Sequence, residues 1–400
     1  MDWISQRIKN LAESETLAMT RKCRELKAQG HQVINLSIGE PDFNTPEFIK
    51  EAGKVAIDNN FTHYPPVAGY PELRQAICTK LKRDNNLDYK PEQIIASAGA
   101  KHSIANAILA LVDPGDEVLI PIPYWVSYKE LVKLAEGIPV YIEAPIHQDF
   151  KIRPEQLEAA ISPRTKLMIY SSPCNPSGSV YTKEELHALA QVLKNHPRVH
   201  VISDEIYEHI NFNGKHESIA QFPEIHERVI LINGVSKGFS MTGWRLGYMA
   251  AALPIAKACD KLQGQVTSGI CTISQQASIA ALLADPGHTE ELRSMQEAFL
   301  KRRNLVLKLV REIPGVIANE PPGAFYVFPN FSTYFGKKNG LQEIASADQL
   351  CDYILNEAHV ALVPGSAFGN PNCIRISYAT SENMLIEAMG RIRKALEKLQ

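Results

Sequence analysis

Short apolar runs recur between residues 90 and 250, and most of them are separated by a polar turn and a helix-like stretch. Continuous runs of this length are typical of strands that are buried on both faces of a sheet. Strands that alternate with helices, such as the apolar stretch 104–111, predict a mostly parallel sheet covered by helices on both faces. The runs occupy residues 93–97, 117–120, 166–170, 199–202, 229–232 and 245–250.

The segment before residue 90 has a different pattern. Residues 5–30 are amphipathic with a helical period, and residues 33–38 alternate like a short strand. Thr45 and Pro46 are suited to the N-cap and first position of the next helix. Pro71 is suited to open another helix.

After residue 290 the alternation of strands and helices gives way to an α+β pattern. A long helix comes first, then strands around residues 316, 324–328, 360–363 and 374–378, and a terminal helix over about 381–398. We therefore expect two domains. Residues 46–288 would form the large one, and residues 1–45 and 289–400 a smaller α+β domain built from both chain ends.

Composition narrows the class of protein. A net charge of −2 over 400 residues gives no electrostatic case for binding nucleic acid or an anionic membrane. Seven cysteines without paired spacing argue against a disulfide framework, and no Cys/His cluster predicts a metal site. No stretch is long and apolar enough to predict a membrane helix or a signal core. The expectation is a soluble cytoplasmic protein.

Polar and aromatic side chains follow the predicted strands where each strand ends. Parallel sheets of this type bind ligands at the carboxyl ends of their strands, so these side chains should meet in one site. Such a gathering is hard to ascribe to coincidence. The side chains are Lys101, Trp125, Asn175, Asp204, Tyr207 and Lys237.

The loop after residues 229–232 carries the most specific chemistry. Gly234 and Gly238 flank Lys237 and leave room for a flat ligand to approach the backbone closely. Arg245, eight residues after the lysine, offers a planar donor fork suited to phosphate. An amine and an anion clamp at one strand end suggest a phosphorylated carbonyl compound held as a Schiff base.

A second phosphate-binding element is predicted at Gly99, Ala100 and Lys101, directly before an apolar helix. The first amides of a helix have no partner within the helix and collect anions. Taken singly, each candidate also has a plainer interpretation. Asp204 and Tyr207 fit buried structural roles, and Arg375 fits a surface ion pair.

Four segments resemble the motifs of the fold-type I, class I pyridoxal-phosphate aminotransferases: SKGFSMTGWR (236–245), NPSG (175–178), SDEIY (203–207) and IRISY (374–378). Three further segments are similar to the bacterial aspartate aminotransferase subgroup, which includes prephenate-active members: GEPDF (39–43), YPPVAG (64–69) and PYWVSY (123–128). The resemblance runs over nearly the whole chain. It implies a mostly parallel seven-stranded sheet between helices with a smaller α+β domain, the cofactor pyridoxal 5'-phosphate and a homodimer.

The resemblance also implies an activity. It is the transfer of an amino group from aspartate to 2-oxoglutarate, giving oxaloacetate and glutamate, by a ping-pong mechanism through a Schiff base on Lys237. The free amine of Lys237 would then carry the substrate proton. Asp204 would keep the pyridine nitrogen protonated, Tyr207 and Asn175 would bind the phenolate oxygen, and Trp125 would stack on the ring.

The remaining cofactor contacts concern the phosphate. The resemblance assigns Arg245, Ser236 and the amides of Ala100 and Lys101 to it, and Tyr64 to the phosphate of the neighbouring subunit. The family often has a serine three residues before the lysine, where this chain has Gly234, so one hydroxyl contact is expected to be missing or replaced.

The substrate contacts implied by the resemblance come from both domains. Arg375 would bind the α-carboxylate bidentately, and the backbone of Gly39 would approach the same group. Lys101 would bind the distal carboxylate of a dicarboxylic substrate, with help from Thr16. The expected substrate-binding set is Arg375, Gly39, Trp125, Asn175, Lys101 and Thr16.

Other functions share parts of this pattern. A prephenate, aromatic or alanine-type aminotransferase would use the same scaffold, and a β-elimination lyase would use the same lysine. Aminotransferase-like modules of transcription regulators carry a basic DNA-binding extension, whereas only about thirty residues precede the first predicted strand here. The aminotransferase interpretation is therefore favoured over the regulator.

Overall fold

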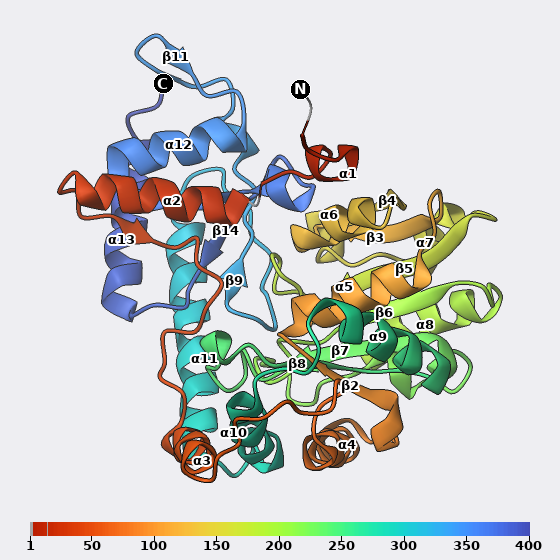
Figure 1. Ribbon diagram of the computed structural model, residues 1–400. Coiled ribbons are helices and arrows are strands. Elements are labelled where there is room, and N and C mark those ends of the chain that lie inside the picture. The colour runs from red at the N-terminus through yellow and green to blue at the C-terminus, as the bar shows by residue number, and fades with distance from the viewer. Residues whose placement is uncertain (1–2, 14) are drawn as a thin grey trace.

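The computed structural model describes residues 3–13 and 15–400 (Figure 1). Its helices are α1 Gln6–Lys9, α2 Glu15–Ala28, α3 Glu47–Asp58, α4 Pro71–Asn85, α5 Ala100–Leu111, α6 Ser127–Leu134, α7 Pro154–Ala160, α8 Lys183–Lys194, α9 Leu253–Val266, α10 Thr272–Leu283, α11 Glu290–Arg311, α12 Ala347–Ala358 and α13 Glu382–Leu396. Its strands are β1 Ile34–Asn35, β2 Ile94–Ser97, β3 Glu117–Ile122, β4 Ile138–Glu143, β5 Thr165–Ser171, β6 His200–Asp204, β7 Val229–Gly234, β8 Gly247–Ala250, β9 Tyr326–Val327, β10 Lys338–Asn339, β11 Gln342–Glu343, β12 Val360–Ala361, β13 Val363–Pro364 and β14 Ile374–Ser377.

Seven strands form the central sheet, in the order β2-β8-β7-β6-β5-β3-β4. Strand β8 runs antiparallel to both of its neighbours, and the other neighbouring pairs are parallel. The predicted mostly parallel sheet is therefore confirmed. The register pairs Ser171 with Asp204 and Asp204 with Ile232, which brings the carboxyl ends of β5, β6 and β7 to one edge.

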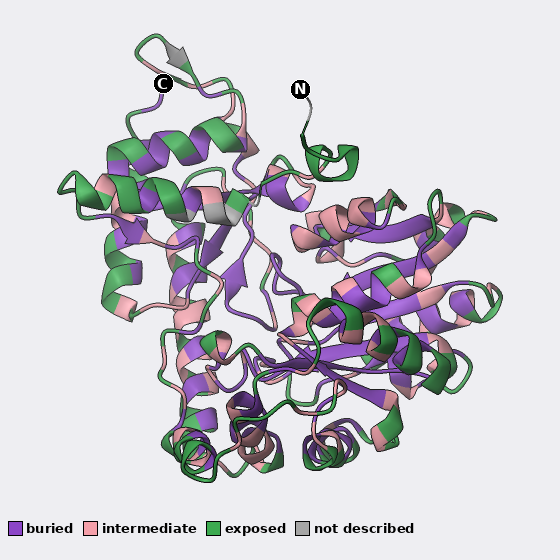
Figure 2. Ribbon diagram, viewed as in Figure 1, coloured by how far each residue is buried: buried purple, intermediate pink, exposed green. Residues whose placement is uncertain are grey.

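Helices cover both faces of this sheet, and the side chains of β7 show how the two faces separate. Ile230 and Ile232 belong to a buried cluster that includes Ile104 of α5 and residues of α9. Val229 and Leu231 point the other way, into a larger cluster that includes residues of α4, α8 and α10. Figure 2 shows the central strands almost entirely buried, which explains their continuous apolar runs.

A second group of elements lies beside the central sheet, at the left of Figure 1. Strands β13, β14 and β9 form an antiparallel sheet, and β1 pairs in parallel with β12. The long helix α11 packs against β9 and α13. Segments from both chain ends thus build this part together, since Ile34 pairs with Val360.

Several predicted elements differ in detail. The amphipathic region 5–30 is divided into α1 and α2, the predicted strand 33–38 is only β1, and the expected strand around 316 is reduced to a single bridge between Ile317 and Asn330. The predicted N-cap role of Thr45 was wrong. Its hydroxyl donates to Ser240 O at 2.7 Å, and Pro46 precedes α3 without a side-chain cap.

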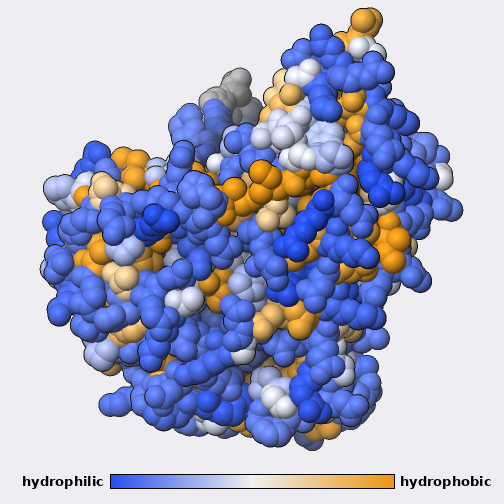
Figure 3. Space-filling model, turned by 180° about the vertical axis from the view of Figure 1, so that it is seen from behind, coloured by the Kyte–Doolittle hydropathy of each residue, from blue (hydrophilic) through white to orange (hydrophobic). Residues whose placement is uncertain are grey.

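No helix among the described residues has the length and apolar character needed to cross a membrane. The rear face is mostly hydrophilic and carries scattered apolar patches (Figure 3).

Candidate active site

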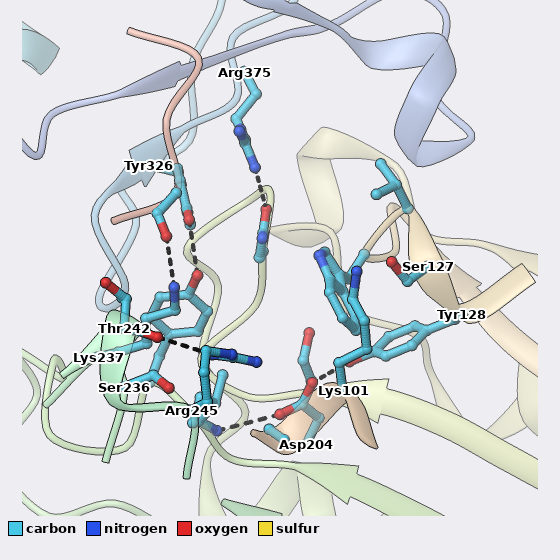
Figure 4. A pocket seen from close by; sticks show the side chains of 18 residues that line it. Lys101, Ser127, Tyr128, Asp204, Ser236, Lys237, Thr242, Arg245, Tyr326 and Arg375 are labelled. Carbon is cyan, nitrogen blue, oxygen red and sulfur yellow. Dashed lines mark hydrogen bonds between the residues drawn. The ribbon is translucent and has the colours of Figure 1, made fainter. Parts of the chain in front are cut away.

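A cavity of about 310 Å³ opens at the carboxyl edge of the central sheet (Figure 4). Gly39, Tyr326 and Arg375 close it from the side of the small sheet. The six strand-end side chains that the sequence predicts to meet all line this cavity, and so do Ala100, Ser236 and Arg245. The six strand-end side chains belong to Lys101, Trp125, Asn175, Asp204, Tyr207 and Lys237.

Two glycines allow the start of α5 to approach the lysine loop. Gly234, the last residue of β7, pairs with Gly247 of β8. A Cβ atom on Gly234 would lie 2.8 Å from Gly247 Cα, and one on Gly247 would lie 2.2 Å from the Ala100 nitrogen. The serine that the family often has at this position would have no room here, so the hydroxyl contact expected to be missing or replaced does not come from position 234. The close packing brings the first turn of α5 to the pocket instead.

Lys237 points into the pocket from the loop after β7. Its Nζ donates to Gly39 O at 2.5 Å. Withdrawal from water lowers the pKa of this amine to about 8, and the nearby carboxylate of Glu40 opposes part of the effect. About a tenth of the amine is therefore neutral at pH 7, and the neutral amine is the form that attacks a carbonyl carbon.

Asp204 stands at the end of β6 and is buried. It accepts hydrogen bonds from Tyr128 Oη at 2.7 Å and from the Ile206 amide at 3.3 Å. Burial raises the pKa of this carboxyl to about 6, although both hydrogen bonds lower it. Asp204 is thus held in place to receive a cationic or N–H partner.

Tyr128 was missed by the sequence analysis. It lies on α6, three residues after Trp125, and the two rings meet edge to face at 5.5 Å between centroids. Its position within an amphipathic helix gave no sign of a polar partner in β6. The only usable signal was the three-residue spacing from Trp125, which places both rings toward the same edge of the sheet.

Tyr207 follows β6 and meets a second missed tyrosine. Its hydroxyl lies 2.8 Å from the hydroxyl of Tyr326, which belongs to β9. Tyr326 stands in an apolar aromatic run that predicts core packing, and the residue is indeed completely buried. It nevertheless lines the pocket.

Arg375, on β14, is a buried cation without a carboxylate partner among the described residues. Its side chain is embedded, with 2% of the residue exposed, so a surface ion pair is excluded. It donates to Asn175 Oδ1 at 2.9 Å and to Ser37 O at 2.6 Å, while its Nε has no partner. A buried guanidinium that lacks a counter-ion is suited to bind an anionic ligand.

A second anion-binding arrangement lies at the start of α5. Gly99 precedes the helix with φ 88° and provides no side-chain cap, so the first amides of α5, from Ala100 and Lys101, remain uncapped by a side chain, and both residues line the pocket. A Cβ atom on Gly99 would lie 2.2 Å from Arg245 Nη2, which shows how closely the guanidinium approaches this turn. Buried Ser236 adds a hydroxyl. Together these groups suit a phosphate.

Lys101 lies at the rim of the same pocket. Its Nζ is 5.0 Å from the centroid of the Trp125 ring, and no carboxylate among the described side chains pairs with it. Partial burial lowers its pKa, and the charge of Arg245 lowers it further. The pocket therefore contains cations on opposite walls, at Arg375 and at Lys101.

One predicted residue does not line this cavity. Tyr64, on the loop between α3 and α4, is 96% exposed and lies outside it. For Thr16 only the backbone is described, as part of α2, and its predicted contact lies outside what the structure describes.

Residues 31–392 match the family described as aminotransferase class I and II. The chain belongs to this family. It is similar to the bifunctional aspartate aminotransferase and glutamate/aspartate-prephenate aminotransferase of Petunia hybrida, with 47% identity over 98% of this chain and 82% of the relative. It is also similar to the aspartate/prephenate aminotransferase of Cereibacter sphaeroides, with 46% identity over 98% of both chains.

Solved structures give the same result. The aspartate aminotransferase from Rhizobium meliloti superimposes with a TM-score of 0.96 at 41% identity, and each chain is covered completely. The expected fold type and enzyme class are confirmed, and so is the dependence on pyridoxal 5'-phosphate that the family shares. The residues of the pocket fit this cofactor, because an amine, a buried carboxyl and a phosphate-binding turn line one cavity.

Proposed function

We propose that this aminotransferase transfers the amino group of aspartate to 2-oxoglutarate. The observation that supports the proposal is the pair of cations on opposite walls of the pocket, Arg375 and Lys101, neither of which has a carboxylate partner among the described residues. A dicarboxylic amino acid needs one cation for each carboxylate. The printed names of the relatives from Petunia and Cereibacter include aspartate.

The side chains around the cofactor have separate roles in this proposal. Bound pyridoxal phosphate supplies an electron sink for the electron pair that remains when the substrate Cα loses its proton. Lys237 would hold the cofactor through Nζ, and its free amine would carry the proton away from the substrate Cα. Asp204, fixed by Tyr128 and the Ile206 amide, holds the proton on the pyridine nitrogen.

The other residues bind and orient. Tyr207 and Asn175 donate toward the phenolate oxygen, and Trp125 covers one face of the ring. The phosphate is held by the Arg245 guanidinium, the Ser236 hydroxyl and the first amides of α5, from Ala100 and Lys101. Each of these groups lines the same cavity as Lys237.

The substrate is proposed to span the cavity. Arg375 binds the α-carboxylate with two parallel hydrogen bonds, near the backbone of Gly39, and Trp125 and Asn175 border it. The ammonium of Lys101 and the positive end of α5 bind the distal carboxylate together, with a contribution from Thr16. Lys101 then sets the preference for acidic substrates.

Lys101→Ser tests this assignment. Its kcat/KM for aspartate and glutamate should fall by about tenfold to 150-fold, which corresponds to about 1.5–3 kcal/mol for a hydrogen bond to a charged group. The value for alanine should change little. Lys183→Ser is the matched control, because Lys183 is also an exposed lysine in the first turn of a helix but lies outside the pocket. Equal losses for acidic and neutral donors would refute the assignment.

Prephenate is a second candidate acceptor, because the relative from Cereibacter is named for aspartate and prephenate. Kinetics with aspartate as donor and either 2-oxoglutarate or prephenate as acceptor distinguish the two possibilities. A kcat/KM for prephenate above that for 2-oxoglutarate would make prephenate the main acceptor.

We also propose that residues 46–288 form a large cofactor-binding domain, and that residues 1–45 and 289–400 form a smaller one. The pairing of β1 with β12 and the hydrogen bond from Ser377 N to Leu36 O at 2.9 Å support this division. The seven cysteines are all free thiols, which supports a reducing compartment such as the cytoplasm.

A homodimer is proposed as the active form. Two buried glutamines form hydrogen bonds with the backbone of the loop that carries exposed Tyr64. Gln263 donates to Val67 O at 2.9 Å, and Gln275 accepts from the Tyr70 amide at 2.8 Å. A rigid loop that presents an aromatic hydroxyl away from its own pocket suits a contribution to the site of a second copy.

A further inference from the structure

The hydroxyl of Tyr326 lies where three parts of the pocket wall meet. The tyrosine belongs to β9 of the small sheet, and its Oη is 2.8 Å from the Oη of Tyr207, which follows β6 of the central sheet. A Cβ atom on Gly39 would lie 2.7 Å from the same Oη, so only a glycine leaves space for it there. Tyr326 is completely buried, and therefore this hydroxyl has little choice of partners.

The hydroxyls of Tyr207 and Tyr326 can together donate only two hydrogen bonds. Each tyrosine carries one O–H donor and can accept two hydrogen bonds. If Tyr207 donates its hydroxyl proton to the phenolate oxygen of the cofactor, it cannot also donate to Tyr326. The hydrogen bond between the two must then run from Tyr326 to Tyr207. A phenylalanine at position 326 would leave Tyr207 free to rotate away from the cofactor.

The surroundings favour Tyr326 as the donor. The guanidinium of Arg375 lies over its ring, with Cζ 4.5 Å from the ring centroid. Burial raises the pKa of Tyr326, and the charge of Arg375 opposes that rise. Burial also raises the pKa of Tyr207, and the charge of Arg375 opposes that rise as well. The asymmetry lies in the geometry: the guanidinium stacks on the ring of Tyr326, where a cation draws electron density from the phenol and makes its hydroxyl a better donor.

We propose that Tyr326 is a positioning residue, which directs the hydroxyl proton of Tyr207 toward the cofactor and connects Tyr207 to the arginine that binds the substrate. The proposal rests on the function proposed above. It assigns to the small sheet a part in the chemistry as well as in substrate binding. Arg375 and Tyr326 enter the pocket from the same side, opposite Asp204 (Figure 4).

Tyr326→Phe removes the hydroxyl and keeps the ring beneath Arg375. The visible spectrum of the cofactor-loaded protein is titrated with pH, because it reports the protonation of the nitrogen that joins Lys237 to the cofactor. A donor to the phenolate oxygen withdraws electron density from that nitrogen, so weaker donation by Tyr207 makes the nitrogen more basic. The midpoint of the titration should rise by about 0.5–1 pH unit, the effect expected for one hydrogen bond.

Two further variants separate positioning from general structure. Tyr353→Phe is the matched control, because its buried hydroxyl also makes one hydrogen bond in the same part of the chain, to Ala395 O at 2.8 Å. It should leave the midpoint unchanged. In the Tyr207→Phe background, Tyr326→Phe should add no further shift, since Tyr326 acts only through the Tyr207 hydroxyl.

The steady-state constants provide a second readout. Tyr326→Phe should lower kcat for aspartate by about threefold to tenfold with a smaller change in KM. An unchanged midpoint in Tyr326→Phe, or an equal shift with and without the Tyr207 hydroxyl, would overturn the proposal. A different result tests the proposed function: it would be refuted if the native protein did not transaminate aspartate.

Discussion

The stability of the cofactor-free protein should depend on pH in a way that reports the surroundings of Asp204. Burial raises the pKa of this carboxyl from its ordinary value of 3.8 to about 6. Between these two values the folded chain holds a proton that the unfolded chain has released, so the free energy of unfolding falls as pH rises. Once the group is fully ionised, the cost is about 3 kcal/mol, from about two pKa units at 1.36 kcal/mol each.

Asp204→Asn removes the titration and keeps the size of the side chain. The cost in the native chain is about 1.6 kcal/mol near pH 5 and about 3 kcal/mol near pH 8, so the variant should gain about 1.4 kcal/mol relative to the native chain between these conditions. The hydrogen bonds from Tyr128 and the Ile206 amide also change, by about 1 kcal/mol. That contribution is nearly independent of pH, and the dependence on pH is therefore the quantity to compare.

Urea unfolding near pH 5 and near pH 8, at one protein concentration and without cofactor, measures both free energies. Asp58→Asn, at the exposed end of α3, is the matched control and should give the same difference from the native protein at both pH values. If Asp204→Asn also differs from the native protein by the same amount at both values, the buried carboxyl does not ionise at a raised pKa. The reasoning about Asp204 would then be wrong.

The remaining predictions concern the lysine and the assembly. Lys237→Ala should lose the visible absorption of the bound cofactor and all transamination, with an unchanged circular dichroism spectrum; retention of either property would contradict the role of Lys237. The active species should sediment as a dimer, and Tyr64→Phe should bind the cofactor more weakly in titrations without any change in that sedimentation. A monomer with full specific activity at high dilution would rule out a shared site.

The strands of the central sheet could be predicted because both of their faces are covered, as in β5, β6 and β7. Strand β4 was not predicted. It lies at the edge of the sheet, contains Pro139 and has a largely exposed face, so its apolar run is broken. Strands such as β9 and β12 are two residues long, and their apolar neighbours made them look longer in the sequence.

The residues of the site also divide into those that the sequence could predict and those that it could not. Lys237, Asp204 and Asn175 lie at or after the ends of strands, and this shared position together with the family motifs made them predictable. Tyr128 and Tyr326 could not, because their hydroxyl partners are 76 and 119 residues away in the chain and the residues themselves sit in apolar patterns. No local pattern encodes such a pair.

The same limit applies to buried charge. Lys80, in the middle of α4, is completely buried and forms an ion pair with Glu208, whose carboxylate also accepts from Asn233 at 2.5 Å. A lysine on a helix predicts an exposed side chain, and only the fold reveals the partner. The pair fixes the residue before Gly234, and so supports the base of the lysine loop.

The pairing of β1 with β12 makes the pocket one of the last parts of the molecule to form during translation. Ile34 pairs with Val360, so roughly 300 residues are made before this strand has a partner. At about 5–20 residues per second, that interval lasts on the order of tens of seconds. Lys237 emerges well before Tyr326 and Arg375, and a chain still attached to the ribosome therefore carries the reactive amine without the opposite wall. The proposed binding of a carboxylate by Arg375 therefore becomes possible only late, after residue 375 has been made.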